Sequence, residues 1–115
     1  ASTENIPLKI VVFNNGNHGM VRQWQKIFYN NRFSASELTH HTPDYVKLAE
    51  AMGAVGLRME QKSEVKDVFE KMLEINDKPV LVDCVVDPED MVFPMVPAGG
   101  SNDVIILNEE DLKKL

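Results

Sequence analysis

Four uncharged hydrogen-bonding side chains and two glycines are packed into residues 14–19, which read Asn-Asn-Gly-Asn-His-Gly. Amide and carbonyl oxygens are hard, neutral ligands that suit Mg²⁺, an ion that usually also takes a carboxylate and phosphate oxygens. A helical pattern begins at Gly19, and the free N–H groups at the start of a helix attract phosphate. The pattern is therefore compatible with half of a Mg²⁺–diphosphate site.

The same residues are also typical of an ordinary tight turn between a strand and a helix. Asn and Gly supply the backbone geometry of such turns without any ligand. His18 would then simply cap the helix that follows. The residue types and their spacing leave both interpretations open.

The element that must position this segment is the apolar run from Lys9 to Phe13. A continuous β-branched and aromatic run is typical of a strand covered on both faces, as in a parallel sheet. Ligands of open parallel sheets lie beyond the carboxyl ends of the strands, where residues 14–18 fall. A helix follows and ends near Asn30-Asn31, because apolar residues recur at helical spacing at Met20, Trp24, Ile27 and Phe28.

Two more helices are expected further along the chain, after a polar loop over residues 32–41. One starts at Thr42-Pro43-Asp44, with Thr42 as its cap, and stops at Gly53. The other is capped by Ser63. Its apolar stripe consists of Val65, Val68, Phe69, Met72 and Leu73.

Continuous apolar runs at residues 54–59 and 79–86 predict two further strands. The order of strand, helix, helix, strand, helix, strand predicts an α/β fold, with a partial parallel sheet and flanking helices. Three strands leave open sheet edges, so we expect the chain to be a piece of a larger protein. Residues 88–107 mix Pro and Gly with apolar side chains and predict an irregular tail that needs a surface to lie on.

Composition narrows the classes of protein. A length of 115 residues suits one domain, and 43% hydrophobic with 26% charged residues is ordinary for a globular chain. The net charge of −6, without a Lys/Arg cluster, argues against a nucleic acid partner. No apolar run approaches the roughly 20 residues of a membrane span. Cys84 is the only cysteine, and its position in an apolar run favours a buried strand residue over a nucleophile.

Asn14-Asn15 after Phe13 resembles the closing half of the thiamine diphosphate motif, which begins with Gly-Asp-Gly and ends with Asn-Asn. The continuation Gly-Met-Val-Arg-Gln-Trp-Gln, residues 19–25, is more specific and is similar to the catalytic subunit of the anabolic acetohydroxyacid synthase (acetolactate synthase) family. Glyoxylate carboligase is a more distant alternative, since it does not usually keep the Trp. The resemblance also includes Phe28-Tyr29-Asn30, Pro43 to Ala49, Pro79 to Asp83, Val86-Asp87-Pro88 and Pro94-Met95-Val96-Pro97.

This resemblance implies the C-terminal portion of a thiamine diphosphate-binding fold. Residues 1–88 would be the last part of that domain, and residues 89–115 a tail that covers the site. The family condenses two pyruvates, or pyruvate and 2-ketobutyrate, with release of CO₂, in branched-chain amino acid biosynthesis. Its cofactors are thiamine diphosphate and Mg²⁺, with FAD bound mostly outside this segment of the parent protein.

The resemblance also implies roles for single residues. Asn15 would coordinate Mg²⁺ with its side chain, and Asn17 would do so with its backbone carbonyl. Trp24 and Arg22 would lie at the substrate channel. No catalytic residue is expected in this chain, because the activating glutamate lies outside it. The cofactor would be lined by Asn15, Gly16, Asn17, His18, Gly19 and Met20.

Several of these positions have a structural alternative. A tryptophan at helical spacing is usually a core residue. Asp83, inside an apolar strand, has by family position a structural hydrogen-bonding role. Residues 91–96 would fill a core as well as they would cover a site, and His40-His41 lack convergent partners for a metal.

The Gly-Asp-Gly half of the motif is absent from this chain, so we expect the chain alone to be catalytically inert. The parent would be a homodimer or homotetramer with 2-ketoacid substrates and a regulatory subunit, without nucleic acid or membrane partners. It would be cytoplasmic in a bacterium or in an organelle of a eukaryote. Two other classes stay open: a non-enzymatic α/β module that self-associates through its sheet edge, and an unrelated nucleotide-binding domain, against which the missing G-x-G-x-x-G argues.

Overall fold

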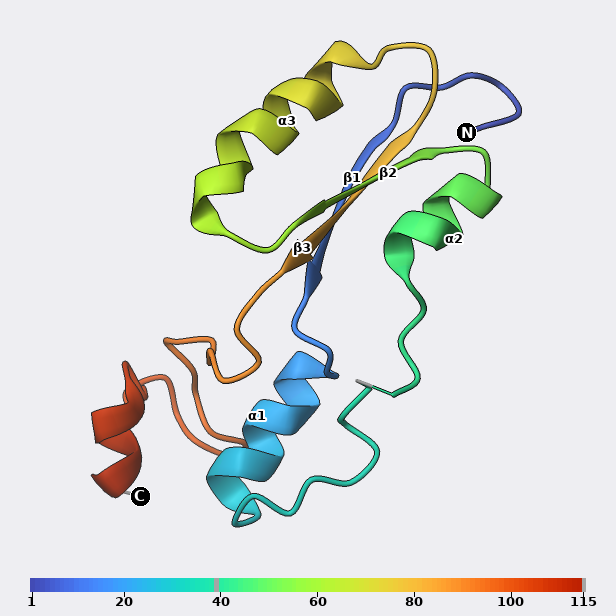
Figure 1. Cartoon of the computed structure of the whole chain (residues 1–115). Helices are drawn as coiled ribbons and strands as arrows, with labels where there is room; N and C mark the ends of the chain where they lie inside the picture. Colours follow the sequence, from blue (N-terminus) through green and yellow to red (C-terminus); the bar gives the residue numbers. More distant parts are fainter. Residues whose placement is uncertain (39, 115) are drawn as a thin grey trace. The chain divides into compact units, whose positions relative to one another are not determined.

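The computed structural model describes residues 1–38 and 40–114. The chain forms two compact units, one of residues 1–16 and 38–87, the other of residues 17–37 and 88–115. The first unit holds the three strands, and the second holds the first helix, α1 (Gly19–Phe28), with the C-terminal residues (Figure 1).

The first unit is built on a three-stranded parallel sheet in the order β1-β3-β2. Its strands are β1 (Lys9–Asn14), β2 (Val55–Met59) and β3 (Val80–Val85). Lys9 and Val55 both lie opposite Val80, so the three strands start in register. The sequence prediction of three parallel strands in an α/β fold is confirmed, with each strand boundary within one residue of the expected one.

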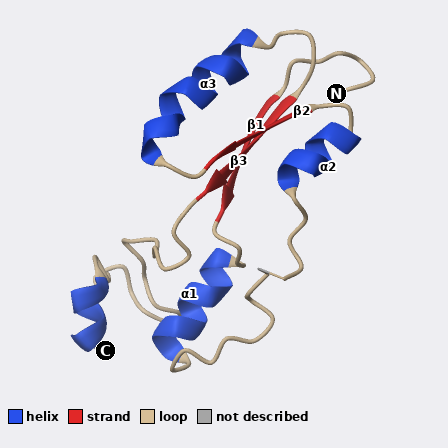
Figure 2. Ribbon diagram, in the orientation of Figure 1, coloured by secondary structure: helices blue, strands red, loops and turns tan. Residues whose placement is uncertain are grey.

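Helices α2 (Tyr45–Ala51) and α3 (Val65–Glu74) lie on opposite faces of this sheet (Figure 2). The α3 face carries the hydrophobic core, which centres on Met59, Met72, Val80 and Val82. Cys84 packs against this core but is only partly buried, less than its apolar neighbours predicted. It lies toward the carboxyl ends of the strands, opposite Phe13 of β1, which is 74% exposed.

Helix α2 begins with a different cap from the one predicted. Asp44 is the N-cap residue, and one of its carboxylate oxygens accepts hydrogen bonds from the N–H groups of Val46 and Lys47. The hydroxyl of Thr42 instead donates to the carbonyl of Leu38, inside the preceding turn. The prediction of Thr42 as cap is therefore wrong, whereas the predicted stop at Gly53 is confirmed by its left-handed φ of +76°.

The start of α3 also differs from the expectation that Ser63 caps it. A short 3₁₀ turn, η1 (Lys62–Glu64), precedes α3, and its cap is Gln61. The carboxylate of Glu64 accepts the N–H groups of Glu60 and Gln61, each at an N···O distance of 2.8 Å. These bonds, Glu60 first, lower the pKa of Glu64. Ser63 lies inside the turn that they close, two residues after the cap of η1 and one residue before Glu64, the N-cap of α3.

In the second unit, α1 ends where the sequence predicted. Asn30 and Asn31 follow it in left-handed backbone conformation, with φ of +52° and +58°. The C-terminal residues are largely irregular, with one antiparallel bridge between Met95 and Ile106 and a short 3₁₀ helix, η2 (Glu109–Lys114). In the part of the chain that the structure describes, no helix is long and apolar enough to cross a membrane.

Gly56 in β2 allows α2 to pack directly on the sheet, and Gly56→Ala tests this contact. A Cβ at this position would lie 2.6 Å from the carbonyl oxygen of Val46 and 2.7 Å from its Cα. We expect the alanine to lower the free energy of unfolding of the chain by about 1–3 kcal/mol, as overpacking of a core does. Urea unfolding measures this, and Glu50→Ala on the exposed side of α2 should stay within about 0.5 kcal/mol of wild type. An unchanged Gly56→Ala stability would show that α2 packs more loosely than described.

Candidate functional site

The first half of the predicted site is a defined turn at the carboxyl end of β1. The Asn14 side-chain oxygen accepts a hydrogen bond from the Gly16 N–H, with an N···O distance of 3.0 Å. Gly16 has a left-handed φ of +66°, which a residue with a side chain adopts at a cost. The Gly16 carbonyl accepts the N–H of Leu38 at 2.8 Å. The backbone on both sides of Asn15 is therefore fixed.

The second half of the predicted site lies in the second unit, at the start of α1. His18 occupies the N-cap position, and its N–H donates to the carbonyl of Ser36 at 2.8 Å. The alternative in which His18 caps the helix thus agrees with its position, although its imidazole makes no capping hydrogen bond. The first turn of α1 also has no acidic residue. The imidazole of His18 therefore leaves the N–H groups at the start of α1 uncapped by its own nitrogens, and no acidic side chain in the first turn compensates the positive end of the helix.

The donor set of residues 14–20 is neutral throughout. It offers amide oxygens, backbone carbonyls and one imidazole, but no carboxylate. Among residues 1–38 and 40–114, no three His, Cys, Asp or Glu side chains come together in a way that would hold a metal ion. These residues fit the neutral, hard-oxygen share of a Mg²⁺ coordination shell, and the start of α1, without an acidic residue in its first turn, fits an anion.

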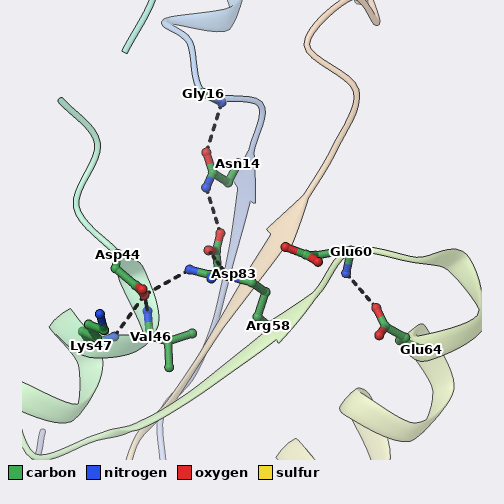
Figure 3. Close-up of polar contacts among 9 residues, drawn as sticks. All are labelled: Asn14, Gly16, Asp44, Val46, Lys47, Arg58, Glu60, Glu64 and Asp83. Atoms are coloured by element: carbon green, nitrogen blue, oxygen red, sulfur yellow. Dashed lines mark hydrogen bonds and ion pairs between the residues drawn. The ribbon is translucent and has the colours of Figure 1, made fainter. Parts of the chain in front are cut away.

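A row of polar contacts connects the turn after β1 to the face of the sheet that α2 covers (Figure 3). Asp83, only 1% exposed, accepts from the Asn14 amide nitrogen and from Arg58 Nε, each at 3.0 Å. Arg58 Nη2 donates to the Asp44 carboxylate at 3.0 Å. Asp83 raises the pKa of Arg58, while the Lys47 N–H, with Arg58 and the Val46 N–H, lowers the pKa of Asp44.

Within the second unit, the side chains of the Arg-Gln-Trp-Gln run in α1 contact different segments, and Gln23 contacts the C-terminal tail. Gln23 is 4% exposed, and its amide pairs with the backbone of Val92. The Gln23 oxygen accepts the Val92 N–H at 2.8 Å, and its nitrogen donates to the Val92 carbonyl at 3.0 Å. This pair of hydrogen bonds resembles the backbone pairing between two strands, and it holds the C-terminal tail on α1.

Gln25 does the same for the loop after α1. Its nitrogen donates to the Ser34 carbonyl at 3.0 Å, and its oxygen accepts the Ser34 N–H at 3.3 Å. The hydroxyl of the fully buried Ser36 donates to the same oxygen. The loop that carries the hydrogen-bond partner of His18 is thereby tied to the helix.

Arg22 is engaged with the tail and the loop together. Its guanidinium donates to the Pro88 carbonyl at 2.9 Å and pairs with the Glu89 carboxylate, which also pairs with Lys26. The guanidinium carbon lies 4.6 Å from the centre of the Phe33 ring, a cation–π arrangement. Arg22 therefore has a structural role, and the role at a substrate channel that the resemblance implied stays a prediction.

Trp24 is half-buried and stacks obliquely on Phe28, with ring centres 4.8 Å apart. It lines an open cavity of about 880 Å³ in the second unit. The cavity is bordered by Met20, Val21, Trp24, Gln25, Tyr29, Arg32, Phe33 and Ser34. Since part of the indole faces this cavity, Trp24 is not a simple core residue.

The predicted site residues thus fall into two groups. Asn15 and Gly16 end the first unit, while Asn17, His18, Gly19 and Met20 begin the second with Arg22 and Trp24. Sequence reasoning missed the tasks of Gln23 and Gln25. The positions of these two glutamines beside a tryptophan do not reveal their hydrogen-bond partners, because those partners lie elsewhere in the chain.

The fold and this turn define the class of protein. Residues 1–84 match the family described as thiamine pyrophosphate enzyme, C-terminal TPP binding domain. The chain belongs to this family.

The chain is also similar to part of several acetolactate synthases. The acetolactate synthase of Mycobacterium bovis is 51% identical over 107 residues, which are 90% of this chain and 17% of the relative. The acetolactate synthase large subunit of Corynebacterium glutamicum is 46% identical over 105 residues, 89% of this chain and 17% of the relative. The mitochondrial acetolactate synthase catalytic subunit of Aspergillus candidus is 37% identical over 114 residues, which are 98% of this chain and 16% of the relative. The chain thus spans about a sixth of the length of these relatives.

The two glutamines give a paired prediction. Gln23→Leu leaves the Val92 N–H and carbonyl without their partner, so amide exchange over residues 91–96 should accelerate by roughly ten- to a hundredfold, as loss of a buried hydrogen bond implies. Gln25→Leu should instead accelerate exchange over residues 32–37. Hydrogen exchange followed by mass spectrometry separates the two, each variant serving as the control for the other. Equal loosening of both segments by either variant would contradict this division.

A pH prediction follows from Glu89. Lys26 and Arg22 hold the pKa of this carboxyl below its ordinary value of about 4.3. A lowered folded-state pKa means that the ion pairs contribute fully above the ordinary value and are lost as the pH falls through the folded-state pKa. Amide protection over residues 88–92 should therefore fall below about pH 4. Glu89→Gln should lower this protection at neutral pH and remove its pH dependence. If the variant keeps the wild-type dependence of amide protection on pH, the ion pairs of Glu89 with Arg22 and Lys26 do not hold this segment.

Proposed function

We propose that this chain supplies the Mg²⁺- and diphosphate-binding segment of an acetolactate synthase catalytic subunit. The observation that supports this most directly is the turn after β1, with Gly16 in left-handed conformation, followed at once by the start of α1, whose first turn has no acidic residue. The parent enzyme would condense two pyruvates, or pyruvate and 2-ketobutyrate, with release of CO₂. The related acetolactate synthases favour this activity over that of glyoxylate carboligase.

The metal would be held by two neutral oxygens of this chain. Asn15 would offer its side-chain oxygen and Asn17 its backbone carbonyl. The carboxylate that Mg²⁺ usually takes as well would come from elsewhere in the parent, since residues 14–20 contain none. Asp83 is engaged with Asn14 and Arg58 through both of its oxygens. For this reason the proposed activity belongs to the parent and not to the chain alone.

Thiamine diphosphate would bind along the same residues. Its diphosphate would face the start of α1, where the helix dipole and the N–H groups favour negative charge. Gly16 and Gly19 would leave room for the close approach of the cofactor, and His18 and Met20 would border it. When bound, the cofactor supplies the centre that stabilises negative charge on the decarboxylated ketoacid, and the protein orients it.

The substrate side would be formed by α1 one turn further on. Trp24 faces the open cavity and would contact the second ketoacid. Arg22, held by Glu89 and stacked on Phe33, would fix the tail and loop around that cavity. The tail of residues 89–115 would then cover the site, and residues 1–88 would be the last part of the cofactor domain.

We further propose that the parent is a homodimer or homotetramer that binds FAD outside this segment and associates with a regulatory subunit. Its location would be the cytoplasm of a bacterium or an organelle of a eukaryote. The fungal relative described as mitochondrial supports the organelle location, and the bacterial relative described as a large subunit supports a further subunit.

The test is Asn15→Ala in the full-length parent. Removing one of the protein's oxygen ligands should weaken Mg²⁺ binding by roughly ten- to a hundredfold or more, and acetolactate formation should fall with it at limiting Mg²⁺. Isothermal titration calorimetry with Mg²⁺ at saturating thiamine diphosphate measures the first, and a colorimetric acetoin assay the second. Asn76→Ala, which removes an exposed amide between α3 and β3, is the matched control. Wild-type Mg²⁺ affinity in Asn15→Ala would contradict the assignment.

A further inference from the structure

Asp83 is a buried charge in the middle of an apolar strand. It lies in β3 between Val82 and Cys84, and it is 1% exposed. A buried carboxylate costs several kcal/mol of desolvation unless its oxygens are well paired, and an apolar residue of similar size often stabilises a core more. Since every other residue of β3 is apolar, the packing of the sheet does not by itself require a charge at this position.

The strand register explains how this charge is paired. Asp83 lies opposite Val12 of β1 and Arg58 of β2. Side chains two residues apart in a strand share a face, so Asn14 lies diagonally beside Asp83 on the side of the sheet that α2 covers. One carboxylate oxygen accepts from Arg58 Nε and the other from the Asn14 amide nitrogen (Figure 3). Arg58 is itself held by Asp44, the cap of α2.

The carboxylate decides which way the Asn14 amide points. Because a carboxylate only accepts hydrogen bonds, the nitrogen of the amide must face Asp83, and the oxygen must face away. That oxygen accepts the Gly16 N–H and so closes the turn around Asn15. If the amide turned over, its nitrogen would face the Gly16 N–H, and two donors would meet.

We propose that Asp83, supported by Arg58, is a positioning residue for the Mg²⁺ ligand Asn15, acting through the amide of Asn14. This inference rests on the proposed function, because Asn15 is a metal ligand only there. The path runs from α2 through β2 and β3 to the end of β1, and every step is a hydrogen bond of 3.0 Å. Asp83 would not touch the metal or the cofactor; it would set the orientation in which Asn15 meets the metal.

The experiment measures Mn²⁺ binding by electron paramagnetic resonance in the full-length parent, at saturating thiamine diphosphate, so that no turnover is needed. Asp83→Asn should weaken Mn²⁺ binding by roughly ten- to a hundredfold, as the loss of an outer-shell partner of a metal ligand does. Asp67→Asn, on the exposed side of α3, is the control and should bind as wild type. Arg58→Lys, which keeps the charge next to Asp83, should weaken binding less than Asp83→Asn does.

Asn14→Leu keeps the experiment decisive if Asp83→Asn does not fold. Leu has the same branched shape and number of heavy atoms as Asn, and position 14 is partly exposed at the end of β1, so the fold should persist. The variant should lose Mn²⁺ affinity to the same extent as Asp83→Asn, and the double variant should lose little more, because both changes break one path. Wild-type affinity in Asn14→Leu, or a lowered melting temperature in Asp83→Asn with unchanged Mn²⁺ affinity, would overturn the proposal.

Asn15→Ala in the same assay separates this inference from the proposed function. If Asn15→Ala binds Mn²⁺ as wild type does, the assignment of Asn15 as ligand fails and the positioning role fails with it. If Asn15→Ala loses binding while Asn14→Leu and Asp83→Asn keep it, Asn15 is a ligand and the positioning role alone is wrong.

Discussion

The carboxylate of Asp83 is the constraint on which the first unit depends most. It lies at the centre of the middle strand, out of reach of water, and its two oxygens are satisfied by one residue from each neighbouring strand. Because an unpaired buried charge is costly, these pairings fix the lateral order of β1, β3 and β2 more strictly than apolar packing alone would. The same charge, through Arg58 and Asp44, ties the start of α2 to the sheet.

The second unit is organised by amides instead of a charge. Gln23 binds the backbone of the tail, and Gln25 binds the backbone of the loop after α1. Arg22 joins both segments to the helix, because it pairs with Glu89 of the tail and stacks on Phe33 of the loop. Through these side chains, a single helix holds two segments of the chain that have little regular structure of their own. The irregular tail expected from its Pro and Gly content is therefore held by buried backbone contacts that a composition argument does not reveal.

The amino-acid pattern predicted the sheet and its helices well, because buried strands at 9–13, 54–59 and 79–86 and apolar stripes at helical spacing leave few alternatives. It failed at the helix caps, where Asp44 replaced Thr42 and Gln61 with Glu64 replaced Ser63, since several polar residues at each helix start are suitable caps and only the path of the backbone selects one. The Asn-Asn turn was predicted from its residue types, but the partner that orients Asn14 is 69 residues away. Such long-range polar pairings carry no local signal, so Asp83 showed only as an interruption of an apolar run.

The spacing of the Arg-Gln-Trp-Gln run has a consequence for how the protein can change over time. Residues 22, 23 and 25 are bound to the tail or the loop, whereas the indole of Trp24 between them stacks on Phe28 and borders an open cavity. Mutational tolerance along this helix should therefore be uneven from one residue to the next. A single codon can vary the shape of the cavity while its neighbours preserve the architecture, so new ligand preferences can arise by small steps without loss of the fold.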